Sequence, residues 1–164
     1  MLALAWPAQW FALIPIILVE SEVFRRTLHL PFRSLIKPIG KANLVSTFVG
    51  IPLAWLGMLL LEFAVGYVGF VLLPKETEVP TYLQYVFFPF TAAWVAADSQ
   101  WQIYFAFIIL AVPFCVVSII IEERVLRRSL AGHSVSVIRE TTRRANILSY
   151  IMLSLLALLF PLLP

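Results

Sequence analysis

The stretch "ESEVFRRTL" at Glu20–Leu28 recurs as "EERVLRRSL" at Glu122–Leu130, and this repetition decides how the chain is organised. A second block behaves in the same way, because "KANLVS" at Lys41–Ser46 recurs as "RANILS" at Arg144–Ser149. The two blocks keep their order and are separated from their copies by 102 and 103 residues. Biased composition does not produce two ordered blocks at nearly equal separations. The chain is therefore predicted to contain a duplicated helical hairpin.

The composition predicts a membrane class for these hairpins. The 164 residues are 62% hydrophobic and 13% charged, whereas an ordinary soluble domain is about half apolar. Several nearly uncharged runs reach the ~20 residues that a helix needs to cross a bilayer. We therefore expect an all-α integral membrane protein with four transmembrane helices, arranged as two parallel-repeat helical hairpins.

The runs divide the chain into three parts. Residues 1–73 form the first predicted hairpin, with spans at about 2–24 and 44–73. Residues 101–164 form the second, with spans at about 101–126 and 145–163. Between them, residues 74–100 are predicted to be an acidic outer loop. This loop holds an interfacial or re-entrant helix at 81–97, because aromatic residues flank Pro89 there.

Charge distribution predicts the orientation. Segments 25–41 and 124–144 are rich in arginine and lysine, and short basic loops stay on the cytoplasmic side of a membrane. Both basic loops lie on one side only if segment 81–97 does not cross. We therefore predict cytoplasmic basic loops, termini outside, and a location in a bacterial inner membrane.

The glutamates of the first repeated block are the main candidates for a polar site. Glu20 and Glu122 each lie five residues before the first residue of the arginine pair in their block, a separation that does not place two side chains on one helix face. Glu22 with Arg26 and Glu123 with Arg127 have the favourable separation of four residues, and they are predicted to form local ion pairs.

The sequence is compatible with two arrangements of Glu20 and Glu122. Each glutamate either pairs across its own hairpin, with Lys41 or Arg144 or with a nearby asparagine, or the two converge into a polar cluster. In that cluster Glu20, Glu122, Asn43 and Asn146 supply oxygen ligands to a cation or a proton. Binding to a lipid headgroup or to a basic residue of a partner is a further alternative.

Asn43 and Asn146 also have a purely structural interpretation. Asparagine is a favoured N-cap residue, and each of the two stands where a basic loop is predicted to meet a span. Glu62 is the remaining acid within an apolar run. It is expected near the outer interface, or in a proton relay if it lies deeper.

The basic residues of the repeats are expected to anchor the protein to anionic lipids or to an acidic partner. They are Arg25, Arg26, Arg127, Arg128, Lys41 and Arg144. Because they lie in short loops and not on a soluble face, no nucleic-acid partner is expected.

The sequence contains no pattern typical of catalysis. There is no His-Glu-x-x-His zinc motif, no glycine-rich phosphate loop and no cysteine pair, since Cys115 is the only cysteine. Both histidines, His29 and His133, lie in the basic loops. We therefore expect no enzymatic activity, no bound metal and no cofactor.

These observations predict an accessory or structural, non-catalytic subunit of a larger membrane complex. Its expected partners are membrane lipids and either other transmembrane subunits or further copies of the chain. The alternative is a small transporter or channel for a cation, a proton or a solute, which uses Glu20 and Glu122 at a pseudo-twofold repeat interface.

Overall fold

The computed structural model describes residues 7–72 and 100–159. Four helices make up this part of the chain: α2 (Pro7–Leu28), α3 (Phe32–Leu72), α5 (Gln100–Ser129) and α6 (Val135–Leu159). No strand occurs in the described residues. The prediction of an all-helical protein is therefore confirmed for the described residues, which form the four helices expected besides the segment at 81–97.

Short turns connect the helices within each pair. After α2 ends at Leu28, Pro31 precedes the first residue of α3, and its carbonyl accepts a hydrogen bond from the main-chain nitrogen of Ser34 at 3.0 Å. Ser134 precedes α6, and its carbonyl accepts the first helical hydrogen bond from Ile138. Serine at this position is a favoured N-cap.

Helices α3 and α6 begin earlier than the sequence predicts. The basic segments 25–41 and 124–144 were expected to be loops, but most of both is helical because α3 begins at Phe32 and α6 at Val135. The charged residues there lie on exposed faces of long helices. These charged residues therefore indicate a solvent-exposed helix face and not a turn.

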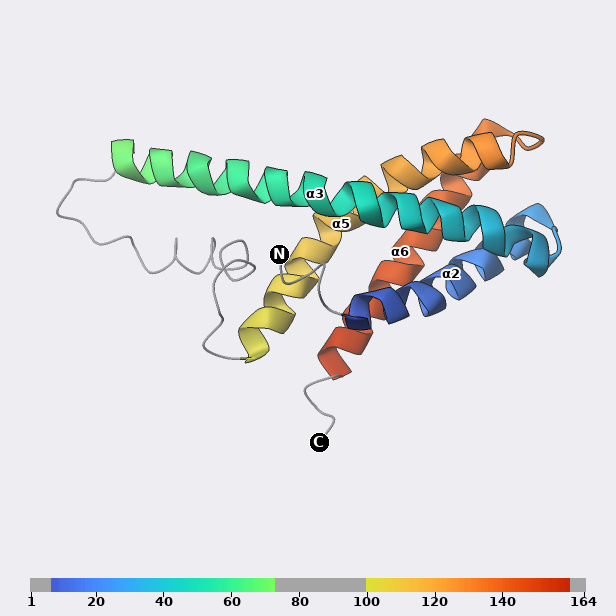
Figure 1. Ribbon diagram of the computed structural model, residues 1–164, viewed down its shortest axis with the longest axis horizontal. Helices are drawn as coiled ribbons and strands as arrows, with labels where there is room; N and C mark the ends of the chain where they lie inside the picture. The colour runs from blue at the N-terminus through green and yellow to red at the C-terminus, as the bar shows by residue number, and fades with distance from the viewer. Residues whose placement is uncertain (1–6, 73–99, 160–164) are drawn as a thin grey trace.

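The four helices form a ring of neighbours. Helix α3 packs against α2 and α5, and α6 packs against α5 and α2. Both turns lie at the same end of the molecule, and α3 continues beyond the other helices at the opposite end (Figure 1). Each helix therefore contacts its hairpin partner and one helix of the other hairpin.

The buried core repeats the internal symmetry of the sequence. Phe24 of the first block and Leu126 of the second are each 1% exposed, and they occupy equivalent positions of the repeat. Ala42 and Ala145 are equivalent in the same way, and both are completely buried. The core is completed by Leu35, Ile39, Leu130 and Ile138. Duplicated sequence thus produces a core with duplicated contacts.

The membrane prediction is not supported. Among the described residues, no helix combines the length and the apolar character that crossing a membrane requires. The predicted location in a bacterial inner membrane, with cytoplasmic basic loops and outer termini, is therefore contradicted.

Some predictions concern residues or side chains that the structure does not describe. The interfacial or re-entrant helix at 81–97 and both termini lie outside the described residues. Glu62 belongs to α3, but its side chain is not among those described.

His29 offers a test of the first turn. It follows the last residue of α2 with a φ of 53°, the left-handed conformation that glycine adopts without a steric penalty. His29→Gly should raise the free energy of unfolding by about 0.5–1 kcal/mol, measured by urea denaturation. Thr27→Gly, within the last turn of α2, is the matched control and should lower it by a similar amount. A loss of stability in both variants would contradict the prediction.

Candidate functional site: a buried cluster of glutamate, asparagine and serine

Two glutamates lie inside the bundle, where carboxyl groups are rare. Glu20 on α2 and Glu122 on α5 are each 1% exposed. Ionisable side chains are almost never fully buried unless they are paired, because the charged form loses its hydration. The contacts of these two residues therefore define the candidate site.

Each glutamate is held by the asparagine of its own hairpin. The amide nitrogen Nδ2 of Asn43 donates to Oε2 of Glu20 at 2.6 Å. The amide nitrogen of Asn146 donates to Oε2 of Glu122 at 2.8 Å. Of the partners expected within a hairpin, the structure shows the asparagines.

The asparagines are not helix caps. Each lies 11 residues after the first residue of its helix, so the N-cap interpretation is wrong. Their amide nitrogens also donate at 3.2 Å to the main-chain carbonyls of Ile39 and Thr142, four residues earlier in the same helices. The amide orientation of both asparagines is thereby set by two hydrogen bonds.

A serine from the opposite hairpin completes each contact. The hydroxyl of Ser149 on α6 donates to Oε1 of Glu20 at 2.9 Å, and that of Ser46 on α3 donates to Oε1 of Glu122 at 2.8 Å. The side-chain hydrogen bonds that the structure shows between the two hairpins therefore end at the carboxyl oxygens of Glu20 and Glu122. We call Glu20, Asn43, Ser46, Glu122, Asn146 and Ser149 the crossed cluster.

The serines were not predicted as site residues. Both occur in the repeated motif Ala-Asn-x-x-Ser, so their recurrence is visible in the sequence. Their partners are not visible there, because each serine contacts a residue 76 or 129 positions away. The repeat was the available signal, and the crossed pairing required the packed structure.

Burial controls the electrostatics of the cluster. Loss of hydration raises the pKa of Glu20 from 4.5 to about 7, against the opposite effect of the hydrogen bonds from Asn43 and Ser149. Burial, together with the charge of Glu20, raises the pKa of Glu122 to about 8. No described cationic side chain forms an ion pair with either glutamate. The cluster therefore favours protonated carboxyl groups near neutral pH.

The other predicted acids form local ion pairs at the surface. Glu22 accepts hydrogen bonds from Arg25 and Arg26, which hold its pKa at about 2. Glu123 pairs with Arg127, as the spacing predicts, and with Arg139 at 3.0 Å. These pairs lie on exposed or partly exposed helix faces and do not belong to the crossed cluster.

The remaining anchoring candidates are also on the surface. Arg144 pairs with Glu140 at 2.8 Å, while Lys41 and Arg128 are exposed. Arg25 and Arg26, together with His29, line a shallow pocket beside the turn between α2 and α3. Neither Lys41 nor Arg144 reaches a buried glutamate.

The chemistry of the cluster is proton binding and hydrogen bonding. The described residues contain no group of three or more histidine, cysteine, aspartate or glutamate side chains placed to hold a metal ion. Comparisons with protein-family models, with curated proteins and with solved structures found no significant match.

The crossed serines provide a first test. Ser46→Ala and Ser149→Ala each remove one hydrogen bond to a buried carboxyl group, so each should lower the free energy of unfolding by about 1–3 kcal/mol. The two losses should be similar because the contacts are equivalent. Ser129→Ala is the control, since this exposed hydroxyl bonds only the carbonyl of Val125 and its removal should change stability by less than about 0.5 kcal/mol. Equal small effects in all three variants would contradict the crossed pairing.

The raised pKa values predict how stability depends on pH. Between about pH 4.5 and pH 8 the folded chain holds protons on Glu20 and Glu122 that the unfolded chain has released. The free energy of unfolding should therefore fall as pH rises through this window, by an amount on the order of a few kcal/mol. Urea denaturation at several pH values measures the fall.

Glutamine at both positions is the matched comparison. Glu20→Gln with Glu122→Gln removes the ionisable groups and should flatten the curve over the same window. Glu22→Gln removes an exposed glutamate whose pKa is low, so it should leave the fall unchanged. A fall of equal size in the double variant would show that other groups cause it.

Proposed function

We propose that this chain is a non-catalytic accessory or structural subunit of a larger complex, and that apolar helices of other protein subunits cover its exposed apolar faces. The support comes from the distribution of apolar side chains between the interior and the surface. The crossed cluster has an internal role in this proposal, because it joins the two hairpins into one unit that partners can bind.

Large apolar side chains are exposed on all four helices. A soluble monomer rarely exposes a contiguous apolar patch of more than a few hundred Å², and larger patches mark interaction surfaces. Here the exposed fraction reaches 69% at Phe11 and Phe63 and 68% at Val112. Tyr67 is 70% exposed, and Phe48 and Leu155 are among the other large apolar side chains that are more than half exposed.

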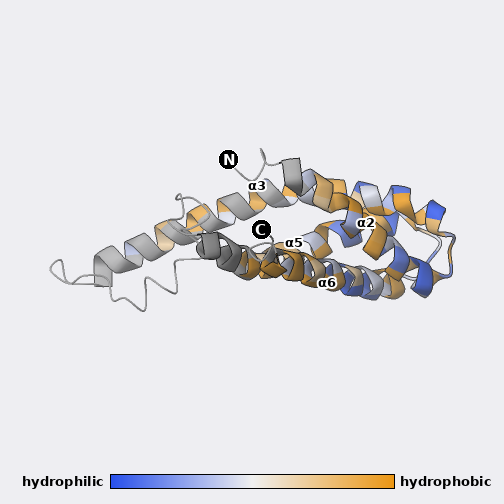
Figure 2. Cartoon of the chain, turned by 90° about the horizontal axis from the view of Figure 1, so that it is seen from below, coloured by the Kyte–Doolittle hydropathy of each residue, from blue (hydrophilic) through white to orange (hydrophobic). Residues whose placement is uncertain are grey.

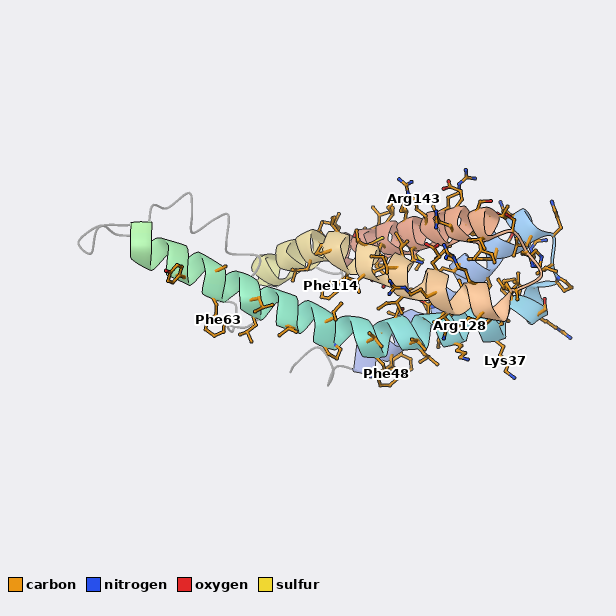
Figure 3. The ribbon with its side chains drawn as sticks, turned by 90° about the horizontal axis from the view of Figure 1, so that it is seen from above. Lys37, Phe48, Phe63, Phe114, Arg128 and Arg143 are labelled. Atoms are coloured by element: carbon orange, nitrogen blue, oxygen red, sulfur yellow. The ribbon has the colours of Figure 1, made fainter. Side chains whose placement is uncertain are left out.

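These side chains lie away from the protein's own core. The core residues belong to the half of the bundle near the two turns, where hydrophilic residues also cover the surface (Figure 2). Phe63 points away from the bundle on the projecting part of α3 (Figure 3). The exposed apolar residues are therefore not part of this buried core, which supports a role in contacting something else.

The chemistry of the surface indicates the kind of partner. Among the side chains that the structure describes between Leu44 and Phe63, the exposed positions of α3 are occupied by apolar residues and glycine, and by Pro52. A charged partner would lose hydration against such a surface without gaining an opposite charge. Helices with leucine, phenylalanine and small residues on one face fit it best.

The contacts at the site do not favour the alternative of ion transport. Both carboxyl groups are closed off from solvent at 1% exposure, and each already accepts two hydrogen bonds from this chain. An ion entering the site would have to displace these bonds. The same contacts support a role of the glutamates in joining the hairpins.

Photo-crosslinking tests the proposal. A benzophenone amino acid in place of Phe48 or Phe63 should capture the same foreign protein subunit from either position, and that subunit should co-purify in a constant ratio. Lys37 and Arg143 extend from the hydrophilic half (Figure 3) and serve as control positions that should give no such product. Products with only a second copy of the chain, or no protein product, would overturn the proposal.

A second prediction separates binding from folding. Phe48→Asn with Phe63→Asn should abolish co-purification of the foreign subunit, because it places amide groups in the proposed apolar contact. Phe63 is 69% exposed, so its substitution should change the free energy of unfolding of the isolated chain by less than about 0.5 kcal/mol. The ring of Phe48 also packs against that of Trp10 on α2, with 5.5 Å between the ring centroids, so its substitution should lower this free energy by about 0.5–1.5 kcal/mol and leave the chain folded. Retention of the subunit in the folded double variant would contradict the proposed contact.

A further inference from the structure

The asparagines of the crossed cluster can act only as donors to their glutamates. Asn43 uses its amide nitrogen on Oε2 of Glu20 and on a helix carbonyl four residues earlier, and Asn146 does the same with Glu122. Both amide hydrogens are then engaged. Oxygen Oε2 of each glutamate therefore remains an acceptor whether the carboxyl group is charged or neutral.

Each serine hydroxyl can donate its hydrogen to either of two oxygens, whereas each asparagine amide uses both of its hydrogens. Ser46 Oγ lies 2.8 Å from Oε1 of Glu122 and 3.0 Å from the main-chain carbonyl three residues earlier. Ser149 Oγ lies 2.9 Å from Oε1 of Glu20 and 3.0 Å from the equivalent carbonyl. A hydroxyl has one hydrogen and two lone pairs, so it donates to only one of these oxygens at a time. When it donates to the carbonyl, it is free to accept a hydrogen bond.

We propose that Glu20 and Glu122 form a buried two-proton binding site that fastens the two hairpins, with one proton on Oε1 of each glutamate donated to the serine of the opposite hairpin. In this state Ser46 and Ser149 turn their own hydrogens to the helix carbonyls. When the protons leave for solvent, both hydroxyls turn back and donate to the carboxylates. The serine–glutamate hydrogen bond can form in either state with its direction reversed, but in the ionised state it has to act against the repulsion between the two carboxylates.

The surroundings make the proton the ligand that fits. When both carboxyl groups are ionised they repel each other, because the charge of Glu20 raises the pKa of Glu122, and no described cation pairs with them. The titratable groups that face them are Cys115 on α5 and Tyr150 on α6, and burial raises the pKa of both, which keeps them neutral. Helix α3 faces the site with Asn43 and Ser46, which do not titrate, and its Lys41 is exposed.

Release of both protons places two negative charges between the hairpins. Glu20 lies where α2 meets α6, and Glu122 where α5 meets α3, through their bonds to Ser149 and Ser46. Repulsion then acts across the boundary between hairpins and not within either one. We call this site a latch. When both glutamates are protonated the two hairpins hold together tightly, and as pH rises the repulsion between the carboxylates weakens their association. This inference does not depend on the proposed subunit function.

Infrared spectroscopy of the full chain detects the bound protons directly. A protonated carboxyl group has a C=O stretching band that disappears on ionisation. The band should be present in mildly acidic solution and vanish as pH rises through neutrality. Each of Glu20→Gln and Glu122→Gln should remove about half of it, and the double variant all of it. Glu22→Gln, at an exposed glutamate, should leave it unchanged.

The serines leave their own signature in the same spectra. In Ser46→Ala the proton of Glu122 loses its acceptor, so that part of the band should move to higher frequency, and Ser149→Ala should do the same for Glu20. A serine that made no hydrogen bond with the protonated carboxyl group would not shift the band. An unshifted band in both alanine variants would overturn the assignment of the proton to Oε1.

Distances between spin labels test the latch itself. In a Cys115→Ala background, labels at Lys37→Cys on α3 and Arg128→Cys on α5 report across the two hairpins, since both positions are exposed. Their distance distribution should broaden or lengthen as pH rises, and should not change in the double glutamine variant. Labels at Thr27→Cys and Lys37→Cys lie within one hairpin and should show no change.

Three outcomes would overturn the proposal. The carboxyl band is absent or insensitive to pH, or the band titrates while the distance between hairpins stays constant. The third is that a chelator or exchange of the dissolved cation abolishes the pH dependence, which would make a metal ion the ligand.

Discussion

Burial of two carboxyl groups without a cationic partner is the constraint on which the rest of this structure depends. Glu20 and Glu122 are each shut off from solvent, and each must find its hydrogen-bond donors inside the bundle. The donors come from both hairpins, an asparagine from the same one and a serine from the other. Four helices are therefore needed to satisfy two side chains, which ties the hairpins into one unit.

The cluster and the core occupy the same half of the molecule. Leu35, Ile39 and Ala42 on α3 are completely buried, and Asn43 and Ser46 follow them on the same helix. Apolar packing supplies most of the favourable free energy there, while the crossed hydrogen bonds specify which hairpin faces pair. Beyond this half many apolar side chains are exposed, although Leu110 and Ala111 of α5 are still buried. The end of the bundle near the turns is thus stabilised by its own core, and the other end exposes many apolar side chains.

Repetition in the sequence predicted more of this structure than composition did. The recurring blocks predicted two equivalent hairpins, and the Glu22 and Glu123 ion pairs followed from helix spacing alone. Composition pointed to membrane spans, and the described helices do not support them. The starts of α3 and α6 were also misjudged, because charged residues on exposed helix faces resemble a loop when only the sequence is read. That error made Asn43 and Asn146 look like caps.

By itself the sequence determined the helical class, the duplication, and the glutamate, arginine, asparagine and serine residues that recur with it. Local spacing carries this information, since a helix brings residues three or four apart onto one face. Only the tertiary structure decided that Ser149 reaches Glu20 and that Ser46 reaches Glu122, across 129 and 76 residues. The physical reason is that these contacts depend on how two helix pairs pack, and a hairpin considered alone leaves one oxygen of its glutamate without a donor.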